Sequence, residues 1–227
     1  MKITNTPEQH LIIVDLDGTI LNNDFSTLNQ RNKKVLQELQ KQGHKICIAT
    51  GRNYLSARPF YQEIGLNSFL ITYNGAYINN PSEKNQEKIV VNPIANSIVR
   101  SILNEKIIKE NLLSVLADRI DQTTISTSDD IYYQEVFFNK NTYLKGDVLK
   151  HLGDKDCLQL VLEFPHDERK INTILATLRR KYCSAITFYC GSKLKSEKEG
   201  ETVLMPDPTK LIIKIRNVFA SKGMATE

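Results

Sequence analysis

The sequence HLIIVDLDGTI, residues 10–20, places two carboxylates directly after an apolar run. Leu11–Val14 is typical of a buried strand, and Asp15 and Asp17 follow it with one residue between them. Two like charges this close repel each other unless a cation or a shared proton compensates. The end of this strand is therefore predicted to need something that offsets the repulsion.

Strand and helix patterns alternate through the first part of the chain. After Leu11–Val14 the apolar spacing predicts a helix, a strand, a helix and a strand, at Thr27–Gln40, Lys45–Ala49, Tyr54–Ile64 and Phe69–Thr72. This order at short spacing predicts an α/β, Rossmann-like core, in which a parallel sheet has helices on its faces.

Polar residues and a glycine follow each of these strands. Thr50, Gly51 and Arg52 come after the second strand, and Asn74-Gly75 comes after the third. Parallel sheets bind their ligands at the carboxyl ends of the strands, and glycine-containing loops let backbone N–H groups approach a phosphate. The loops are therefore expected to form one ligand-binding rim together with the two aspartates.

The pattern changes after Gly75, where the polar stretch Asn79–Lys88 predicts a turn or a hinge. Beyond it the sequence predicts a separate α+β unit inserted into the first. Two helices are expected in this unit, one that begins near Ile94 and one at Asp167–Arg180. The expected strands are Ile89–Val91, Leu113–Leu116, Thr123–Thr127, Ile131–Phe138, Leu158–Phe164 and Ala185–Cys190. The predicted division is residues 1–82 for the first part of the core, 83–206 for the inserted cap and 207–227 for the return to the core.

The last stretch predicts a short strand at Thr202–Met205, a turn at Pro206–Pro208 and a final helix. The apolar residues that suggest this helix by their spacing are Leu211, Ile212, Ile215, Val218 and Phe219. An amphipathic helix here is expected to pack back on the core.

Three motifs together carry a family resemblance. D-L-D-G-T at Asp15–Thr19, T-G-R at Thr50–Arg52 and N-G-A at Asn74–Ala76, interrupted by an α+β insertion, resemble the haloacid dehalogenase-like superfamily and its Cof-type branch of phosphatases. The resemblance implies Mg²⁺-dependent hydrolysis of a small phosphorylated metabolite, a sugar phosphate or a phosphorylated cofactor, through an aspartyl phosphate.

The resemblance also assigns roles to residues. It implies that Asp15 is the nucleophile and that Asp17 protonates the leaving alcohol and then activates water. Mg²⁺ would be held by the Asp15 carboxylate and the backbone carbonyl of Asp17, since a hard cation with few carboxylates and phosphate oxygens suits magnesium. The residues expected to bind the phosphoryl group or substrate are Thr50, Gly51, Arg52, Asn74 and Lys210. Arg52 has two readings that stay open: it reaches the substrate, or it holds its own loop.

Lys210 is chosen as the phosphate-neutralising cation because it opens the predicted last helix. The helix dipole disfavours a positive charge there unless the lysine meets an anion. It resembles the lysine that Cof-type proteins place after a short turn, and the alternative is an ordinary surface lysine.

The acidic G-D-x-x-N-D loop that continues the family pattern is absent from this sequence. Residues 153–156 (GDKD), 128–130 (SDD) and 146–147 (GD) are interpreted as solvated turns, not as substitutes. The expectation is an incomplete core with impaired activity, in which Leu11–Val14 is an unpaired apolar edge open to self-association. The alternatives are a non-catalytic remnant that binds phosphorylated ligands or a partner protein, and, less favoured, a response-regulator-like receiver.

Composition excludes several other classes. The formal charge of +4 is spread along the chain, with no basic block interleaved with aromatics, which argues against nucleic-acid binding. The four cysteines lack zinc-site or disulfide-framework spacing. The sequence shows neither a signal peptide nor an apolar stretch of membrane-spanning length, so a cytoplasmic protein without a membrane partner is expected.

Overall fold

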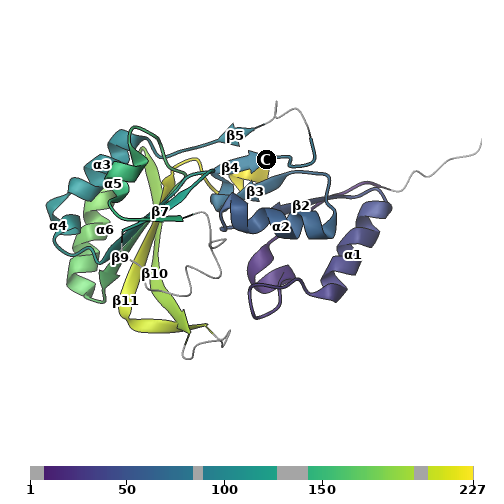
Figure 1. Ribbon diagram of the computed structural model, residues 1–227, viewed down its shortest axis with the longest axis horizontal. Coiled ribbons are helices and arrows are strands. Elements are labelled where there is room, and N and C mark those ends of the chain that lie inside the picture. The colour runs from purple at the N-terminus through teal and green to yellow at the C-terminus, as the bar shows by residue number, and fades with distance from the viewer. Residues whose placement is uncertain (1–7, 84–88, 127–142, 197–203, 227) are drawn as a thin grey trace, which may run out of the picture.

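The computed structural model describes residues 8–83, 89–126, 143–196 and 204–226, which form two α/β units side by side (Figure 1). The sheet of the first unit has the order β1-β2-β3-β4-β5. Its strands are β1 (Leu11–Val14), β2 (Lys45–Ala49), β3 (Leu70–Thr72), β4 (Tyr77–Asn79) and β5 (Val90–Val91). The first three strands run parallel, and β4 and β5 add to them antiparallel.

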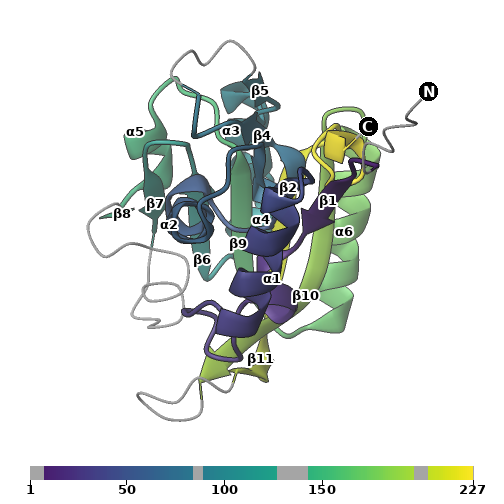
Figure 2. The same ribbon diagram turned by 90° about the vertical axis from the view of Figure 1, so that its right-hand side faces the viewer.

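Helices α1 (Gln30–Lys41) and α2 (Tyr54–Ile64) pack on one face of this sheet. Asn29 and Asn53 cap their first turns, and α2 ends at Gly65, whose φ of 80° is in the left-handed region. On the other face Cys47, Ala49 and Ile71 meet Ala225 of the C-terminal segment. In Figure 2 the first unit faces the viewer, with α1 in front.

The second unit is the inserted cap, built on a six-stranded sheet of order β10-β11-β9-β6-β7-β8. Its strands are β6 (Ser114–Asp118), β7 (Thr123–Ile125), β8 (Tyr143–Lys145), β9 (Gln159–Pro165), β10 (Ile186–Ser196) and β11 (Leu204–Asn217). Its helices are α3 (Asn96–Asn104), α4 (Lys106–Lys109), α5 (Val148–Leu152) and α6 (Glu168–Tyr182). All neighbouring strands are antiparallel except β7 and β8.

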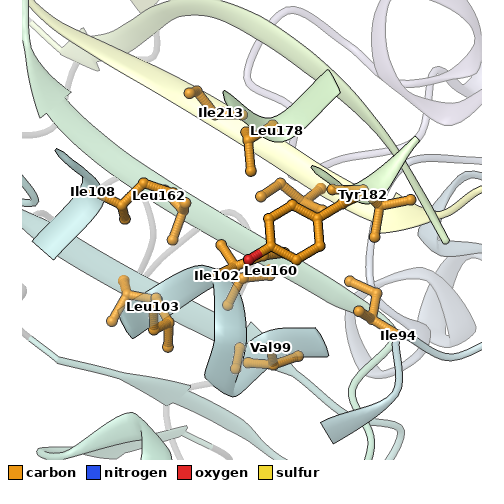
Figure 3. Close-up of a cluster of buried hydrophobic side chains, with 14 of the residues drawn as sticks. Ile94, Val99, Ile102, Leu103, Ile108, Leu160, Leu162, Leu178, Tyr182 and Ile213 are labelled. Atoms are coloured by element: carbon orange, nitrogen blue, oxygen red, sulfur yellow. The ribbon is translucent and has the colours of Figure 1, made fainter. Parts of the chain in front are cut away.

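The helices of the cap cover the face of its sheet that is turned away from the first unit (Figure 1). Figure 3 shows the core between them, where residues of α3, α4 and α6 meet alternate residues of β9 and β11: Val99, Ile102, Ile108, Leu178, Tyr182, Leu160, Leu162 and Ile213. Strand side chains alternate between the two faces, so the intervening residues of β9 and β11 lie on the face toward the first unit.

The predicted α/β core with an inserted α+β cap is confirmed. Strands β1 and β2 and helix α2 have the bounds expected from the sequence, and the sequence GD at 146–147 is a helix-capping turn, as Asp147 accepts from the backbone N–H of Lys150 at 3.0 Å. As expected, β1 is an edge strand in the described part of the chain, with Leu11 57% and Ile13 39% exposed. The predicted strand Ile131–Phe138, residues 128–130 and residues 197–203 lie outside the described residues.

The expected final helix is wrong. Residues 204–217 form β11, a strand of the cap sheet that pairs with both β9 and β10. The run Leu211–Ile215 fits a helical spacing, yet its isoleucines suit a pleated sheet, and neighbours on both sides satisfy its backbone. The turn expected at Pro206–Pro208 is an irregularity in β11, where the pairing with β10 shifts register.

The boundaries between the units also differ from the predicted ones. β5 pairs with β4 in the first sheet, so the cap begins after Val91, and β11 keeps the chain in the cap as far as Asn217. The Asn217 side chain donates to the carbonyl of Pro93 at 2.7 Å and thereby ties together the two connections between the units. None of the described helices is both long and apolar enough to cross a membrane.

The buried carboxyl of Asp118 is expected to make the stability of the protein depend on pH. Burial raises the pKa of its carboxyl to about 6, from an unfolded value near 3.8. Since the folded pKa is the higher one, ionisation costs stability as pH rises through this window. The free energy of unfolding of Asp118→Asn, compared with that of wild type, should therefore be about 1–3 kcal/mol more favourable to the variant at pH 7 than at pH 3.5. Urea unfolding at both pH values measures this, and an unchanged difference between the two proteins would contradict it.

Candidate active site

Asp15 ends β1 and is paired with a cation from the other end of the chain. Its Oδ1 accepts from the backbone N–H of Leu16 at 2.8 Å, and its Oδ2 accepts from Lys222 Nζ. Both side chains remain partly accessible, 38% for Asp15 and 36% for Lys222. The ion pair therefore lies where a ligand from solvent can reach it.

Asp17 is paired with a different cation, Arg52 of the loop after β2. Arg52 Nε donates to both carboxylate oxygens of Asp17, at 3.1 and 3.0 Å, and Nη2 donates to Oδ1 at 2.5 Å. The same Nη2 donates to the carbonyl of Phe25 at 2.5 Å, and the guanidinium lies 5.4 Å from the ring centroid of Phe60. Because the Arg52 side chain is only 3% exposed, it fixes the position of Asp17 from below the surface.

The loops after β2 and β3 are locked to each other by backbone hydrogen bonds. The N–H of Asn74 donates to the carbonyl of Thr50 at 2.9 Å, and the N–H of Tyr73 donates to the carbonyl of Arg52 at 2.8 Å. A Cβ on Gly51 would lie 3.1 Å from Asn74 Nδ2, so glycine allows this close approach. The structure thus brings together the residues that the sequence predicted at the strand ends: Asp15, Asp17, Thr50, Gly51, Arg52 and Asn74.

The C-terminal segment is held against the loop after β3. Ala220 is buried in a cluster with Tyr73, Ala76 and Tyr77. Gly75 has φ +99°, and a Cβ there would lie 2.4 Å from the carbonyl oxygen of Ser221. This contact places the residue next in the chain, Lys222, beside Asp15.

The prediction that Lys210 opens the last helix and neutralises the phosphate at Asp15 is not supported, because Lys210 lies on a strand and pairs with a carboxylate of the cap. It lies on β11 in the cap sheet, and its Nζ is 2.9 Å from Glu163 Oε1 of β9. The cation beside Asp15 is Lys222, which sequence reasoning missed. Its signal was the polar tripeptide Ser221-Lys222-Gly223, and the assumption of a continuous helix through residue 219 hid it.

The donor atoms around Asp15 suit a hard cation. Mg²⁺ takes one or two carboxylates and keeps waters or phosphate oxygens in its other positions. The Asp15 carboxylate, whose cation Lys222 is itself partly exposed, and the backbone carbonyl of Asp17 fit that pattern, whereas the Asp17 carboxylate is held by the buried guanidinium of Arg52. Among the described residues no group of three or more His, Cys, Asp or Glu side chains is arranged to hold a metal.

Comparison with known proteins points to one family. A family model described as haloacid dehalogenase-like hydrolase matches residues 12–203. The chain is 29% identical over 147 residues to 5-amino-6-(5-phospho-D-ribitylamino)uracil phosphatase YitU of Bacillus subtilis, covering 64% of this chain and 53% of the relative. It is 28% identical over 163 residues to the putative phosphatase YkrA of the same organism, covering 72% and 60%. It thus spans between half and two thirds of the length of these relatives.

The fold has close counterparts among solved structures. A haloacid dehalogenase-like hydrolase from Bacteroides thetaiotaomicron superposes with a TM-score of 0.71 at 21% identity, covering 96% of this chain and 75% of that one. At this identity the likeness shows the shared fold, with both the core and the cap included.

The contact between Gly75 and Ser221 predicts a site-specific cost. Gly75→Ala adds a Cβ that the backbone of Ser221 cannot accommodate, in addition to the strain of a positive φ. Gly65→Ala is a matched control, because Gly65 has φ +80° and no described atom lies within 4 Å of the place that its new methyl group would take. We expect about 1 kcal/mol of destabilisation for the control and about 2–4 kcal/mol for Gly75→Ala in thermal or urea unfolding. Equal losses would show that the C-terminal segment does not press on Gly75.

Proposed function

This chain belongs to the haloacid dehalogenase-like hydrolase family, and from that premise we propose that it hydrolyses the phosphate ester of a small metabolite. The observation that carries the proposal is the pair of carboxylates at the end of β1, each with its own cation. Relatives named as phosphatases of small phosphorylated compounds support the substrate class. A sugar phosphate or a phosphorylated cofactor is the proposed substrate.

In the proposed reaction Asp15 is the nucleophile. One carboxylate oxygen attacks phosphorus, the ester oxygen leaves with the alcohol, and the phosphoryl group is held as an aspartyl phosphate. Lys222 Nζ, already in contact with Asp15 Oδ2, lies where it can neutralise charge on the phosphoryl oxygens. Mg²⁺, when bound at the Asp15 carboxylate and the Asp17 carbonyl, adds positive charge that stabilises the phosphoryl group in the transition state.

Asp17 is the proposed general acid and base. In its protonated form it gives a proton to the leaving alcohol, and as the carboxylate paired with Arg52 it then accepts one from the water that hydrolyses the aspartyl phosphate. Arg52 acts as a positioning residue for Asp17, since its buried guanidinium holds the carboxylate through Nε and Nη2. Thr50, Gly51 and Asn74 form the adjacent rim, where the backbone N–H of Gly51 and the Asn74 side-chain amide are proposed to bind phosphoryl oxygens.

A second candidate is a protein that binds phosphorylated ligands without turnover. It is favoured by the two ion pairs of the site, because Lys222 and Arg52 already balance the charges of Asp15 and Asp17 without a metal ion. Phosphate release separates the candidates, because both bind a phosphorylated ligand and only the first converts it.

We further propose that the protein acts in the cytoplasm. All four cysteines are free thiols, and burial raises the pKa of the Cys47 thiol to about 11. Unpaired cysteines favour a reducing compartment.

Substitution of the two candidate lysines tests the site. We expect Lys222→Met to lower kcat/KM for 4-nitrophenyl phosphate with Mg²⁺ by about 10²–10³-fold, because it removes the cation at Asp15. Lys210→Met is the matched control and should stay within about threefold, since Lys210 pairs with Glu163 in the cap. Asp15→Asn should abolish phosphate release. Equal effects of the two lysine variants would contradict the assignment, and a folded wild-type protein without turnover would favour the binding-only candidate.

The exposed edge of β1 supports a proposal of self-association. Its apolar side chains Leu11 and Ile13, and the edge of its backbone that pairs with no strand of the described residues, can pair with another chain. Ile13→Lys should lower the association constant about tenfold in sedimentation equilibrium. Val35→Lys, at a residue of α1 that is 51% exposed, is the control and should leave association unchanged. A monomeric wild type at high concentration would contradict the proposal.

A further inference from the structure

A row of polar side chains crosses the cap sheet on the face toward the first unit. The strand pairing joins Thr187 to Arg216, Gln159 to Asp118 and Asp118 to Thr123. The β9–β11 ladder runs as far as Leu160 opposite Ile215, so its next step places Gln159 opposite Arg216. Directly opposite residues of antiparallel strands share a face, so these five residues form one row, the cap row.

The cap row is on the face that the helices leave open. Its members alternate along their strands with Leu160 and Ile215, which are buried under the helices. Asp118, Thr123 and Gln159 are nevertheless 4%, 2% and 6% exposed. They are therefore polar groups held at the junction of the two units, where burial demands hydrogen-bond partners.

Two atoms of the cap row lack partners within the described part of the chain. Thr123 Oγ1 donates to Asp118 Oδ1, and Gln159 Nε2 donates to Asp118 Oδ2 at 3.4 Å. Among the described residues these bonds leave Gln159 Oε1 as a buried acceptor without a donor, and Arg216 Nε as a buried donor without an acceptor. A buried donor and a buried acceptor on opposed residues point to a ligand group that can satisfy both.

The cap row lies close to the proposed phosphoryl site. The hydroxyl of Tyr73 donates to the carbonyl of Arg119, next to Asp118, at 2.9 Å, and the backbone N–H of Tyr73 donates to the carbonyl of Arg52 at 2.8 Å. Leu158, next to Gln159, packs with Tyr73 and Ala220. One residue thus bridges the cap row and the phosphate-binding loop.

Electrostatics support the same proximity. Burial lowers the pKa of Lys214, which shares its strand and face with Arg216, and the Arg216 charge lowers it further. Asp17 and Asp118 act in the opposite direction, so both carboxylates are near enough to influence this part of β11.

We propose that Arg216 Nε and Gln159 Oε1 together bind a hydroxyl group on the alcohol part of the substrate, so that the protein selects polyol or sugar phosphates over esters of plain alkyl alcohols. This rests on the proposed function, which places the phosphoryl group at Asp15. A hydroxyl oxygen accepts from Arg216 and its proton is donated to Gln159. A second anionic group suits the cap row less well, because it would face the Gln159 oxygen and the Asp118 carboxylate.

Binding of two esters of equal chain length tests the inference. Asp15→Asn protein, which binds without turnover, is titrated calorimetrically with D-ribitol 5-phosphate and with n-pentyl phosphate. We expect about tenfold or greater preference for ribitol 5-phosphate. Gln159→Leu and Arg216→Met, each in the same background, should reduce the preference to about twofold or less. Lys210→Met, on the same strand and face but outside the cap row, should keep it.

Arg216→Lys separates hydrogen bonding from charge. It retains the positive charge but lacks Nε, so the preference should fall as in Arg216→Met. Equal affinities for the two esters, affinity for neither, or a preference that survives all three cap-row variants would overturn the inference. Hydrolysis of both esters by the wild-type protein is measured separately. If the cap row determines the binding preference but no ester is hydrolysed, the proposed function alone is refuted. If both esters bind and are hydrolysed equally well, the inference alone is refuted.

Discussion

Two carboxylates at the end of one strand, with a single residue between them, repel each other, and the fold brings a separate cation to each of them. Asp17 obtains Arg52, 35 residues away along the chain, from the next parallel strand. Asp15 obtains Lys222, 207 residues away. Arg52 follows β2, the parallel neighbour of β1, and so lies near Asp17 within the core sheet. Lys222 reaches Asp15 only after the chain has passed through the whole cap.

The return segment couples the cap to the site. Asn217 ends β11 and holds the other cap connection through Pro93, Ala220 packs on the loop after β3, and Ser221 meets Gly75. A displacement of the cap sheet would therefore act on the segment that carries Lys222. The same loop residue, Tyr73, donates a hydrogen bond to the cap at the carbonyl of Arg119, so the loop after β3 contacts both the cap and the loop after β2. The contacts of the cap and the placement of Lys222 beside Asp15 thus depend on one structural element, the loop after β3.

Periodic and local signals were sufficient for the three parallel strands of the core, and long-range pairing decided the rest, including the addition of β4 and β5 to that sheet. The strands Leu11–Val14 and Lys45–Ala49 and the helix Tyr54–Ile64 followed from apolar runs bounded by turn residues, and the rim residues followed from the rule that ligands lie at the carboxyl ends of parallel strands. The run Leu211–Ile215 was ambiguous because the identity of its neighbours, β9 and β10, is not local information. Lys210 was consequently chosen in place of Lys222. The pairing of Asp17 with Arg52 likewise depends on contacts that no spacing encodes.

The charges at the site also bear on how a phosphate ester can be accommodated. Asp15 and Asp17 are balanced by Lys222 and Arg52, so this set of four side chains is formally neutral. A phosphate monoester adds a charge of about −1.5 to −2 near neutral pH. Its arrival beside Asp15 would therefore leave an excess of negative charge that these four groups do not cancel, and a divalent cation held there would offset it. With both acids ionised, the formal neutrality of these four groups thus supports the proposal that Mg²⁺ binds together with the phosphate ester.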